Sequence, residues 1–313
     1  MIKSIVTLGA ALACALLSTQ SAHAANCATL SVSPAAPSIP TWNPLNPAAQ
    51  EANFTATITR VSSSTKAIRL IFLDANSSAA PTRVGTTSGP RYDIVNVNSG
   101  ATISFPSGTQ VATQTVPQIA FSNSSVASVQ VNLKVRIAAN TNPSEDFVGG
   151  TIYSETLNYA VQCFKSDGGS NPGATDGPLG ANLSLNLSIP KLASIVTATP
   201  SAINFGQFTT TSQQLMVTVK STSTLNVSAT TANGGQFVRS GAVAPYPTNS
   251  TIPYAMTFNG SALPTGGMLT NQTRAGVNGS SFPLALTLTG GLPTGKLAGS
   301  YADTITLTIT AGS

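Results

Sequence analysis

Few residues in this chain carry the chemistry that an active site needs. The single histidine, His23, lies within residues 1–24, which have the features of a secretory signal peptide. Lys3 precedes an apolar run from Ile5 to Leu17 that is too short to cross a bilayer, and Ala22-His23-Ala24 is a small-x-small cleavage sequence. The exported chain then contains no Ser-His-Asp triad, no Cys-His pair and no imidazole metal ligand.

The carboxylates do not single out a catalytic pair. A glycosidase needs only two acids at a set separation, and Asp74, Asp93, Glu145 and Asp146 are the candidates in the first half. Nothing in the sequence selects two of them. The segment that holds Asp167 and Asp176 lacks the spaced oxygens and closing Glu of a calcium loop. We therefore expect neither an enzyme nor a metal or cofactor site.

The basic residues do not predict a nucleic-acid partner either. The chain has 14 Lys and Arg against 9 Asp and Glu, a formal net charge of +5. These basic residues are scattered singly along the sequence, whereas nucleic acid or an anionic membrane surface requires a cluster.

Cys27 and Cys163 would be the only cysteines after signal cleavage. An even pair in an oxidising compartment predicts a disulfide, which here would bracket the first half of the chain. In the chain-entropy model, closing a loop of this length stabilises the fold by about 4–5 kcal/mol.

The two halves of the chain end in similar sequences, GGTIYSETLNYAV (149–161) and AGSYADTITLTI (298–309). Tyr153 aligns with Tyr301, and Glu155 aligns with Asp303. The alternation of apolar and polar residues after each acid predicts a half-buried strand. The recurrence predicts one architecture built twice in tandem.

The remaining composition, rich in Ser, Thr, Asn, Gly and Val with frequent turn residues, predicts an all-β protein of two sandwich domains. We expect a first domain at 25–165, a flexible Gly/Pro-rich linker at 166–180 and a second domain at 181–313. The expected strands are 27–33, 53–61, 67–75, 91–97, 126–138 and 151–163, with a short one at 115–121, and then 194–200, 214–221, 225–231, 254–260, 282–290 and 301–310.

The second half resembles the spore coat protein U domain, the pilin fold of archaic (Csu-type) chaperone–usher pili. The residues that carry the resemblance are TPSAINFGQF (199–208) and LPTGKLAGSYADTITLTIT (292–310). ANLSLNLSIP (181–190) is similar to the donor strand that precedes the first strand of such pilins. The family often has a cysteine before that strand, and this half has none. The two-domain organisation is similar to that of a tip subunit.

This resemblance implies two tandem immunoglobulin-like domains, the second lacking one strand so that a hydrophobic groove is open. It implies a periplasmic chaperone that covers the groove, an outer-membrane usher, and the donor strand of the next pilin subunit, which replaces the chaperone by β-strand addition. The acceptor strand would be the last one. Its anchors would be Tyr301, Ile305, Leu307 and Ile309.

The resemblance also implies a place in the fibre. Only Ala25 and Asn26 would precede Cys27 in the exported chain, so we expect no N-terminal donor strand and a position at the pilus tip, on the cell surface after export through the periplasm. A tip adhesin that attaches to abiotic or host surfaces and promotes biofilm formation is the expected function. The alternative is a shaft or adaptor pilin without an adhesive role.

The alternating apolar stretch at 183–189 has two possible positions. It completes the first domain in cis through Leu183, Leu185, Leu187 and Ile189, or it is the first strand of the second domain.

The loops expected at the free pole of the first domain would make the surface contact. If Cys27 and Cys163 are joined at the pole nearest the linker, the loop at 34–50 lies at the opposite pole, together with 76–90, about 106–114 and 139–150. Trp42 in the Pro-rich loop is either a cap on the core or an exposed apolar fingertip. The candidate surface-binding residues are Ile39, Pro40, Trp42, Pro44, Leu45, Val84 and Val111.

Overall fold

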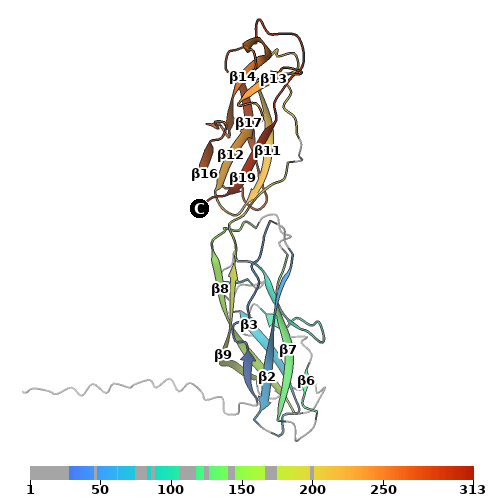
Figure 1. The fold of residues 1–313 in the computed structure, drawn as a ribbon. Coiled ribbons are helices and arrows are strands. Elements are labelled where there is room, and N and C mark those ends of the chain that lie inside the picture. Colours follow the sequence, from blue (N-terminus) through green and yellow to red (C-terminus); the bar gives the residue numbers. More distant parts are fainter. Residues whose placement is uncertain are drawn as a thin grey trace, which may run out of the picture.

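The computed structural model describes residues 28–45, 48–61, 63–74, 83–85, 89–105, 118–122, 127–139, 145–165, 175–197 and 201–313. The expected all-β class is confirmed, and two sandwich domains lie end to end, with the C-terminus near their junction (Figure 1). No helix in the described ranges is long and apolar enough to span a bilayer. The expected signal peptide (1–24), Cys27 and Val111 lie outside the described residues.

The first domain packs two sheets over one apolar core. One sheet has the order β1 (Ala28–Ser33), β2 (Gln50–Arg60), β7 (Ser128–Ile137), β4 (Tyr92–Asn96). The other has the order β5 (Ser104–Phe105), β3 (Ala67–Asp74), β8 (Ile152–Phe164), β9 (Thr175–Ser188), with β6 (Ile119–Ala120) paired to β3. Alternation directs every second side chain into the core, as Phe54, Ala56 and Ile58 show in β2.

The second domain repeats this plan. Its larger sheet has the order β10 (Ala193–Ile195), β11 (Ser212–Ser221), β17 (Ser280–Leu288), β14 (Thr251–Phe258), β13 (Gln236–Arg239), β18 (Tyr301–Ala302), with β15 (Ser261–Ala262) paired to β14. Its smaller sheet has the order β16 (Met268–Gln272), β12 (Leu225–Thr231), β19 (Ile305–Ala311). A short 3₁₀ helix at Thr248–Ser250 precedes β14.

The position of β9 corrects the expected domain boundaries. β9 starts at Thr175, inside the expected linker (166–180), and pairs antiparallel with β8 from Ile152 opposite Ser188 to Gln162 opposite Thr175. Residues 181–189 therefore belong to the first domain and not to a second domain at 181–313. Of the two positions left open by the sequence, the structure has the one in cis.

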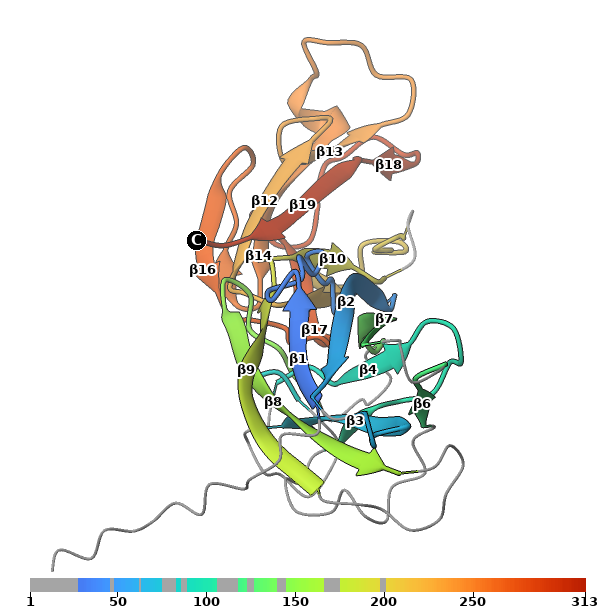
Figure 2. The same cartoon turned by 90° about the horizontal axis from the view of Figure 1, so that it is seen from below.

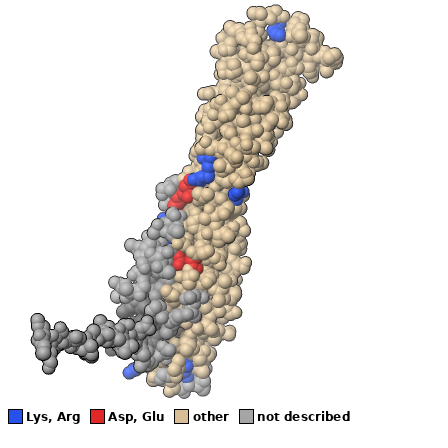
Figure 3. Space-filling view, turned by 90° about the vertical axis from the view of Figure 1, so that its left-hand side faces the viewer, with Lys and Arg blue, Asp and Glu red and all other residues tan. Residues whose placement is uncertain are grey.

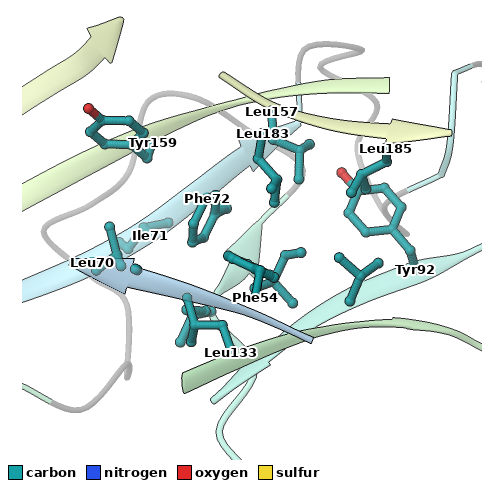
Figure 4. Close-up of a cluster of buried hydrophobic side chains, with 14 of the residues drawn as sticks. Phe54, Leu70, Ile71, Phe72, Tyr92, Leu133, Leu157, Tyr159, Leu183 and Leu185 are labelled. Carbon is teal, nitrogen blue, oxygen red and sulfur yellow. The ribbon is translucent and has the colours of Figure 1, made fainter. Parts of the chain in front are cut away.

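The physical reason is the burial of four apolar side chains. Leu183, Leu185, Leu187 and Ile189 are each 0% exposed and belong to the core cluster of the first domain. Leu183 and Leu185 lie in one cluster with Phe72 of β3, in the same sheet, and with Phe54 and Leu133 of the facing sheet (Figure 4). Each such side chain stabilises the fold by about 1.5–3 kcal/mol when it leaves water.

The course of β9 also reverses the expected poles of the first domain. β9 runs antiparallel beside β8 (Figure 2) and its C-terminal end leads into the second domain, so the end of β8 at Cys163 lies at the pole away from the second domain. The Trp42 backbone N–H instead donates to the Ser188 carbonyl (3.4 Å), next to the start of the second domain. The prediction that loop 34–50 lies at the free pole is therefore wrong.

The two domains are joined by specific contacts across the junction. The Gly149 N–H donates to the Thr222 carbonyl (2.8 Å), and the Thr222 hydroxyl donates to the Pro190 carbonyl (2.8 Å) and accepts the Leu192 N–H (2.8 Å). A Cβ at position 149 would lie 2.5 Å from the Thr222 Oγ1, so only glycine permits this approach.

An ion pair closes the same junction. Both carboxylate oxygens of Asp146 accept from the Arg274 guanidinium (2.8 and 2.5 Å), and Oδ1 also accepts the Val277 N–H (3.0 Å). Burial alone would raise the pKa of Asp146, but these hydrogen bonds and the Arg274 charge hold it below its usual value. Val277 is buried in the first-domain cluster, so the second domain contributes to the core of the first.

We predict that Leu185→Ala lowers the free energy of unfolding of the first domain by about 2–5 kcal/mol, because it removes a buried side chain and leaves a cavity. Chemical denaturation of the full chain measures this. Ser188→Ala, at an exposed position of the same strand, is the matched control and should change the stability by less than about 0.5 kcal/mol. Equal stability of the two variants would contradict the role of β9.

Candidate functional site

The unpaired edge of β19 is the main candidate site. β19 pairs on one side with β12, from Leu225 opposite Ala311 to Thr231 opposite Ile305. On its other side no strand pairs with it anywhere in residues 175–197 and 201–313. An unpaired strand presents free N–H and C=O groups to any chain that can extend the sheet. We call this feature the β19 edge.

The apolar side chains of the β19 edge are only half-buried. Ile305, Leu307 and Ile309 point toward the core of the second domain. Tyr301, expected beside them, is also half-buried but lies in β18 of the larger sheet, where it pairs with Arg239 of β13. Further half-buried apolar side chains pack against the same core from β10 and the segment after it: Ala193, Ile195, Ile203 and Phe208. The β19 edge is thus an incompletely covered apolar row beside a free backbone ladder.

In the first domain, a further strand covers the row of apolar side chains that aligns with the row on β19. Leu157, Tyr159 and Val161 of β8 align with Ile305, Leu307 and Ile309 of β19, and all three β8 residues are buried. They are buried because β9 lies along β8, with Leu183 directly opposite Leu157. In the described residues, no second-domain strand takes the position that β9 takes in the first domain.

The aligned acids of the repeat are structural anchors. Glu155 accepts the Gly85 N–H (3.1 Å) and the Thr156 N–H (3.0 Å). Asp303 likewise accepts two backbone N–H groups, from Asn233 (3.0 Å) and Thr304 (2.8 Å). Each carboxylate therefore fixes the start of a long strand to a neighbouring turn, which explains why both halves keep an acid there.

Asp303 also accepts a hydrogen bond from the Tyr254 hydroxyl (2.7 Å). Burial raises the pKa of Tyr254 well above its ordinary value, and the hydrogen bond to Asp303 and its negative charge raise it further. The neutral phenol is thus the form that the fold stabilises.

The expected surface-binding loops are largely buried. Trp42 is 1% exposed and packs edge-to-face on Phe147, with ring centroids 5.0 Å apart. Pro44 and Val84 are buried, Ile39 and Leu45 are half-buried, and Pro40 is exposed. The exposed-fingertip interpretation of Trp42 is therefore wrong, because this pole faces the second domain. Val111 lies outside the described residues.

The candidate carboxylates of a hydrolase are held in separate ion pairs. Glu145 binds Arg83 (2.6 Å) and Arg91 (2.9 Å). Burial would raise the Glu145 pKa, but the hydrogen bonds and charges of these arginines lower it below its usual value. Asp93 pairs with Arg136 (2.8 Å), and Asp146 pairs with Arg274, as described above. The side chain of Asp74 lies outside the described residues.

A neutral pocket of about 330 Å³ lies on the first domain. Its lining combines apolar residues such as Leu70, Ile103 and Val131 with amide residues such as Asn98 and Gln130. No charged residue lines this pocket, and it is separate from the β19 edge.

No family model matches the chain, and no curated protein matches it in sequence. Among solved structures, the chain is similar to the CsuC–CsuE chaperone–tip adhesion subunit complex of Acinetobacter baumannii (12% identity, TM-score 0.35, 82% of this chain and 91% of that chain). It is similar to a CFA/I chaperone–tip adhesin complex (12%, 0.36, 89% and 95%) and to the CupB6 tip adhesin of Pseudomonas aeruginosa (12%, 0.34, 84% and 87%). Similarities at this level do not establish a function, and the resemblance to the spore coat U domain is not confirmed.

We predict that Tyr254 stays protonated at pH values where an ordinary tyrosine, with a pKa of 10.0, ionises. Its raised pKa stabilises the fold below pH 10, and this contribution is lost as the pH rises further, because the unfolded chain then releases the proton. Absorbance titration at 295 nm detects this ionisation as a step at higher pH than that of an ordinary tyrosine. Asp303→Asn should move it to lower pH, and Tyr254→Phe should remove it; an unchanged curve in both variants would contradict this assignment.

Proposed function

We propose that this chain is the tip subunit of a chaperone–usher pilus, joined to the fibre through its second domain and making the adhesive contact through its first. The observation that carries the proposal is the difference between the two domains. β9 completes the first domain in cis, whereas the β19 edge has no strand paired with it in the described residues.

The β8–β9 pair indicates how the β19 edge would be filled. β9 runs antiparallel to β8 and places Leu187, Leu185 and Leu183 opposite Tyr153, Glu155 and Leu157. Transferred to the aligned residues, a donor strand would place its apolar anchors opposite Tyr301, Asp303 and Ile305 and continue toward Leu307 and Ile309. Four such anchors contribute of the order of 6–12 kcal/mol as an upper bound.

The use of β9 inside the first domain supports the terminal position. Leu183, Leu185, Leu187 and Ile189 form the donor-like strand that the sequence singles out, and all four are buried in this chain's own core. They are therefore not available to fill a neighbouring subunit. A shaft or adaptor subunit, the alternative function, would have to present a free strand of this kind.

Before fibre assembly, the β19 edge would be covered by a periplasmic chaperone, and the usher would exchange the chaperone for the donor strand of the next pilin. The route runs through the periplasm to the cell surface, which is also where the expected Cys27–Cys163 disulfide would form. Cys163 is buried near the end of β8, at the pole that faces away from the second domain.

We propose that this outward pole makes the contact with abiotic or host surfaces that leads to biofilm formation. It includes the turn between β2 and β3, where Val61 is 62% exposed, and the end of β8. This position replaces the loop at 34–50, which lies at the opposite pole.

We predict that Leu307→Asp lowers incorporation of this chain into fibres at least tenfold, because a charge replaces an apolar anchor beside the donor strand. Loss of one anchor, about 1.5–3 kcal/mol, corresponds to at least a tenfold weaker junction. Immunogold counts on isolated fibres measure this effect. Thr308→Asp, on the exposed face of the same strand, is the matched control, and circular dichroism of both secreted variants checks their folding. Wild-type labelling of Leu307→Asp fibres would contradict the acceptor role.

We predict that Val61→Asp reduces attachment to polystyrene and biofilm mass several-fold while leaving fibre assembly unchanged. Val97→Asp is the control, because Val97 is also an exposed valine (47%) of the first domain but bonds to the Asn132 carbonyl on the side of the sandwich. If both variants attach as the wild type does, the outward pole is not the contact surface.

A further inference from the structure

The junction between the two domains shows what lies beyond the end of a completing strand. β9 leaves the first domain at Ser188, and the second domain begins directly after Pro190. The segment just before β8, residues 145–150, contacts that second domain through Asp146 and Gly149. The folded unit that follows β9 therefore contacts the segment that precedes β8, the strand with which β9 pairs.

The same relation, transferred to the second domain, points to its far pole. Aligning Tyr153 with Tyr301 maps 145–150 onto 293–298, the segment before β18 and β19. A donor strand antiparallel to β19 would run from the Ala311 end toward the Tyr301 end. Ala311 is near the junction, where the Gly312 N–H donates to the Thr224 carbonyl (2.7 Å), so the donor would leave at the pole away from the first domain.

That far pole is built from two loops that lie side by side, 239–250 and 289–300. The Leu297 N–H donates to the Asn249 carbonyl (2.9 Å), and the Lys296 Nζ donates to the Thr248 carbonyl (2.7 Å). The Arg239 Nε donates to the Ala298 carbonyl (2.8 Å), so both ends of loop 239–250 are bonded to residues 296–298. These bonds hold the pole in one conformation before any partner arrives.

The far pole exposes three apolar side chains. Val243 is 80% exposed, Leu292 is 49% exposed and Leu297 is 44% exposed. The two loops contain Arg239 and Lys296 but no acidic residue. On the face drawn in Figure 3, the charge that is visible near this end of the second domain is basic. An apolar surface with a basic rim is suited to an apolar partner that carries an acid.

We infer that the far pole of the second domain, centred on Val243 and Leu297, is a docking surface for the folded body of the pilin whose donor strand fills the β19 edge. This inference rests on the proposed function. That pilin is the partner because its donor strand would end at this pole, just as β9 ends beside residues 145–150. The junction to the fibre thus consists of a strand and a surface contact, as the junction between the two domains does.

Site-specific photocrosslinking in assembled fibres tests the inference. p-Benzoylphenylalanine replaces one residue of the full chain at a time, in cells that assemble the pilus, and isolated fibres are irradiated. Val243 and Leu297 probe the far pole. Thr308, on the exposed face of β19, probes the donor strand, and Met268, exposed on β16 at the other edge of the sheet, is the control.

The expected result is an adduct of this chain with one pilin from Val243, Leu297 and Thr308, at least tenfold more abundant than from Met268. Adduct from Thr308, with yields from Val243 and Leu297 no higher than from Met268, would overturn the docking surface and leave the proposed function intact. The absence of pilin adduct from all four positions would overturn the proposed function, and the docking surface with it.

Discussion

The pairing of β9 with β8 is the constraint on which the rest of this structure depends. A β-sandwich is stable only when each apolar row along its strands is covered and each buried strand edge is paired. β9 meets both requirements for the first domain, with four side chains that lose all contact with solvent. β9 follows β8 in the sequence and pairs antiparallel with it, so its C-terminal end lies beside the start of β8. The second domain therefore follows at that pole of the first.

The second domain is built on the same repeat, but in the described residues no strand pairs with the free edge of its last long strand. Its equivalents of Leu157, Tyr159 and Val161 remain half-buried, so one chain contains a completed and an uncompleted version of one architecture. The β8–β9 pair gives a direction and a register for a strand that would complete the second domain. The acids at Glu155 and Asp303 keep the start of both strands in place whether or not a further strand is present.

The sequence predicts most strands within about three residues, because alternation of apolar and polar residues is a local property that the structure preserves. β12 matches its expected range, and β2, β3, β7 and β8 differ only at their ends. Alternation specifies the apolar face of 183–189 but not the sheet that it joins, since four aliphatic side chains fit beside either domain. The short strands β13 and β16 were not expected, because four or five half-exposed residues carry no clear period.

The errors in the candidate site follow from that one ambiguity. Without the reversal made by β9, counting strands from Cys163 places the Trp42 loop at the outer pole. Trp42 packs against Phe147, which is far away in the sequence, and both belong to the core cluster that Val277 of the second domain joins. The β19 edge, by contrast, lies on the last strand, the one that the resemblance to the pilin fold implies as the acceptor strand.

The direction of β9 has a mechanical consequence. The second domain is attached to the end of β9 that lies beside Ile152, and β9 is aligned with the long axis of the molecule (Figure 1). A tensile force between the two ends of the molecule would act along β9 and load its hydrogen bonds to β8 in shear. In that geometry the bonds share the load and must rupture together, whereas a force across the strand would peel them apart one by one. The strand that completes the core is therefore also oriented to resist pulling.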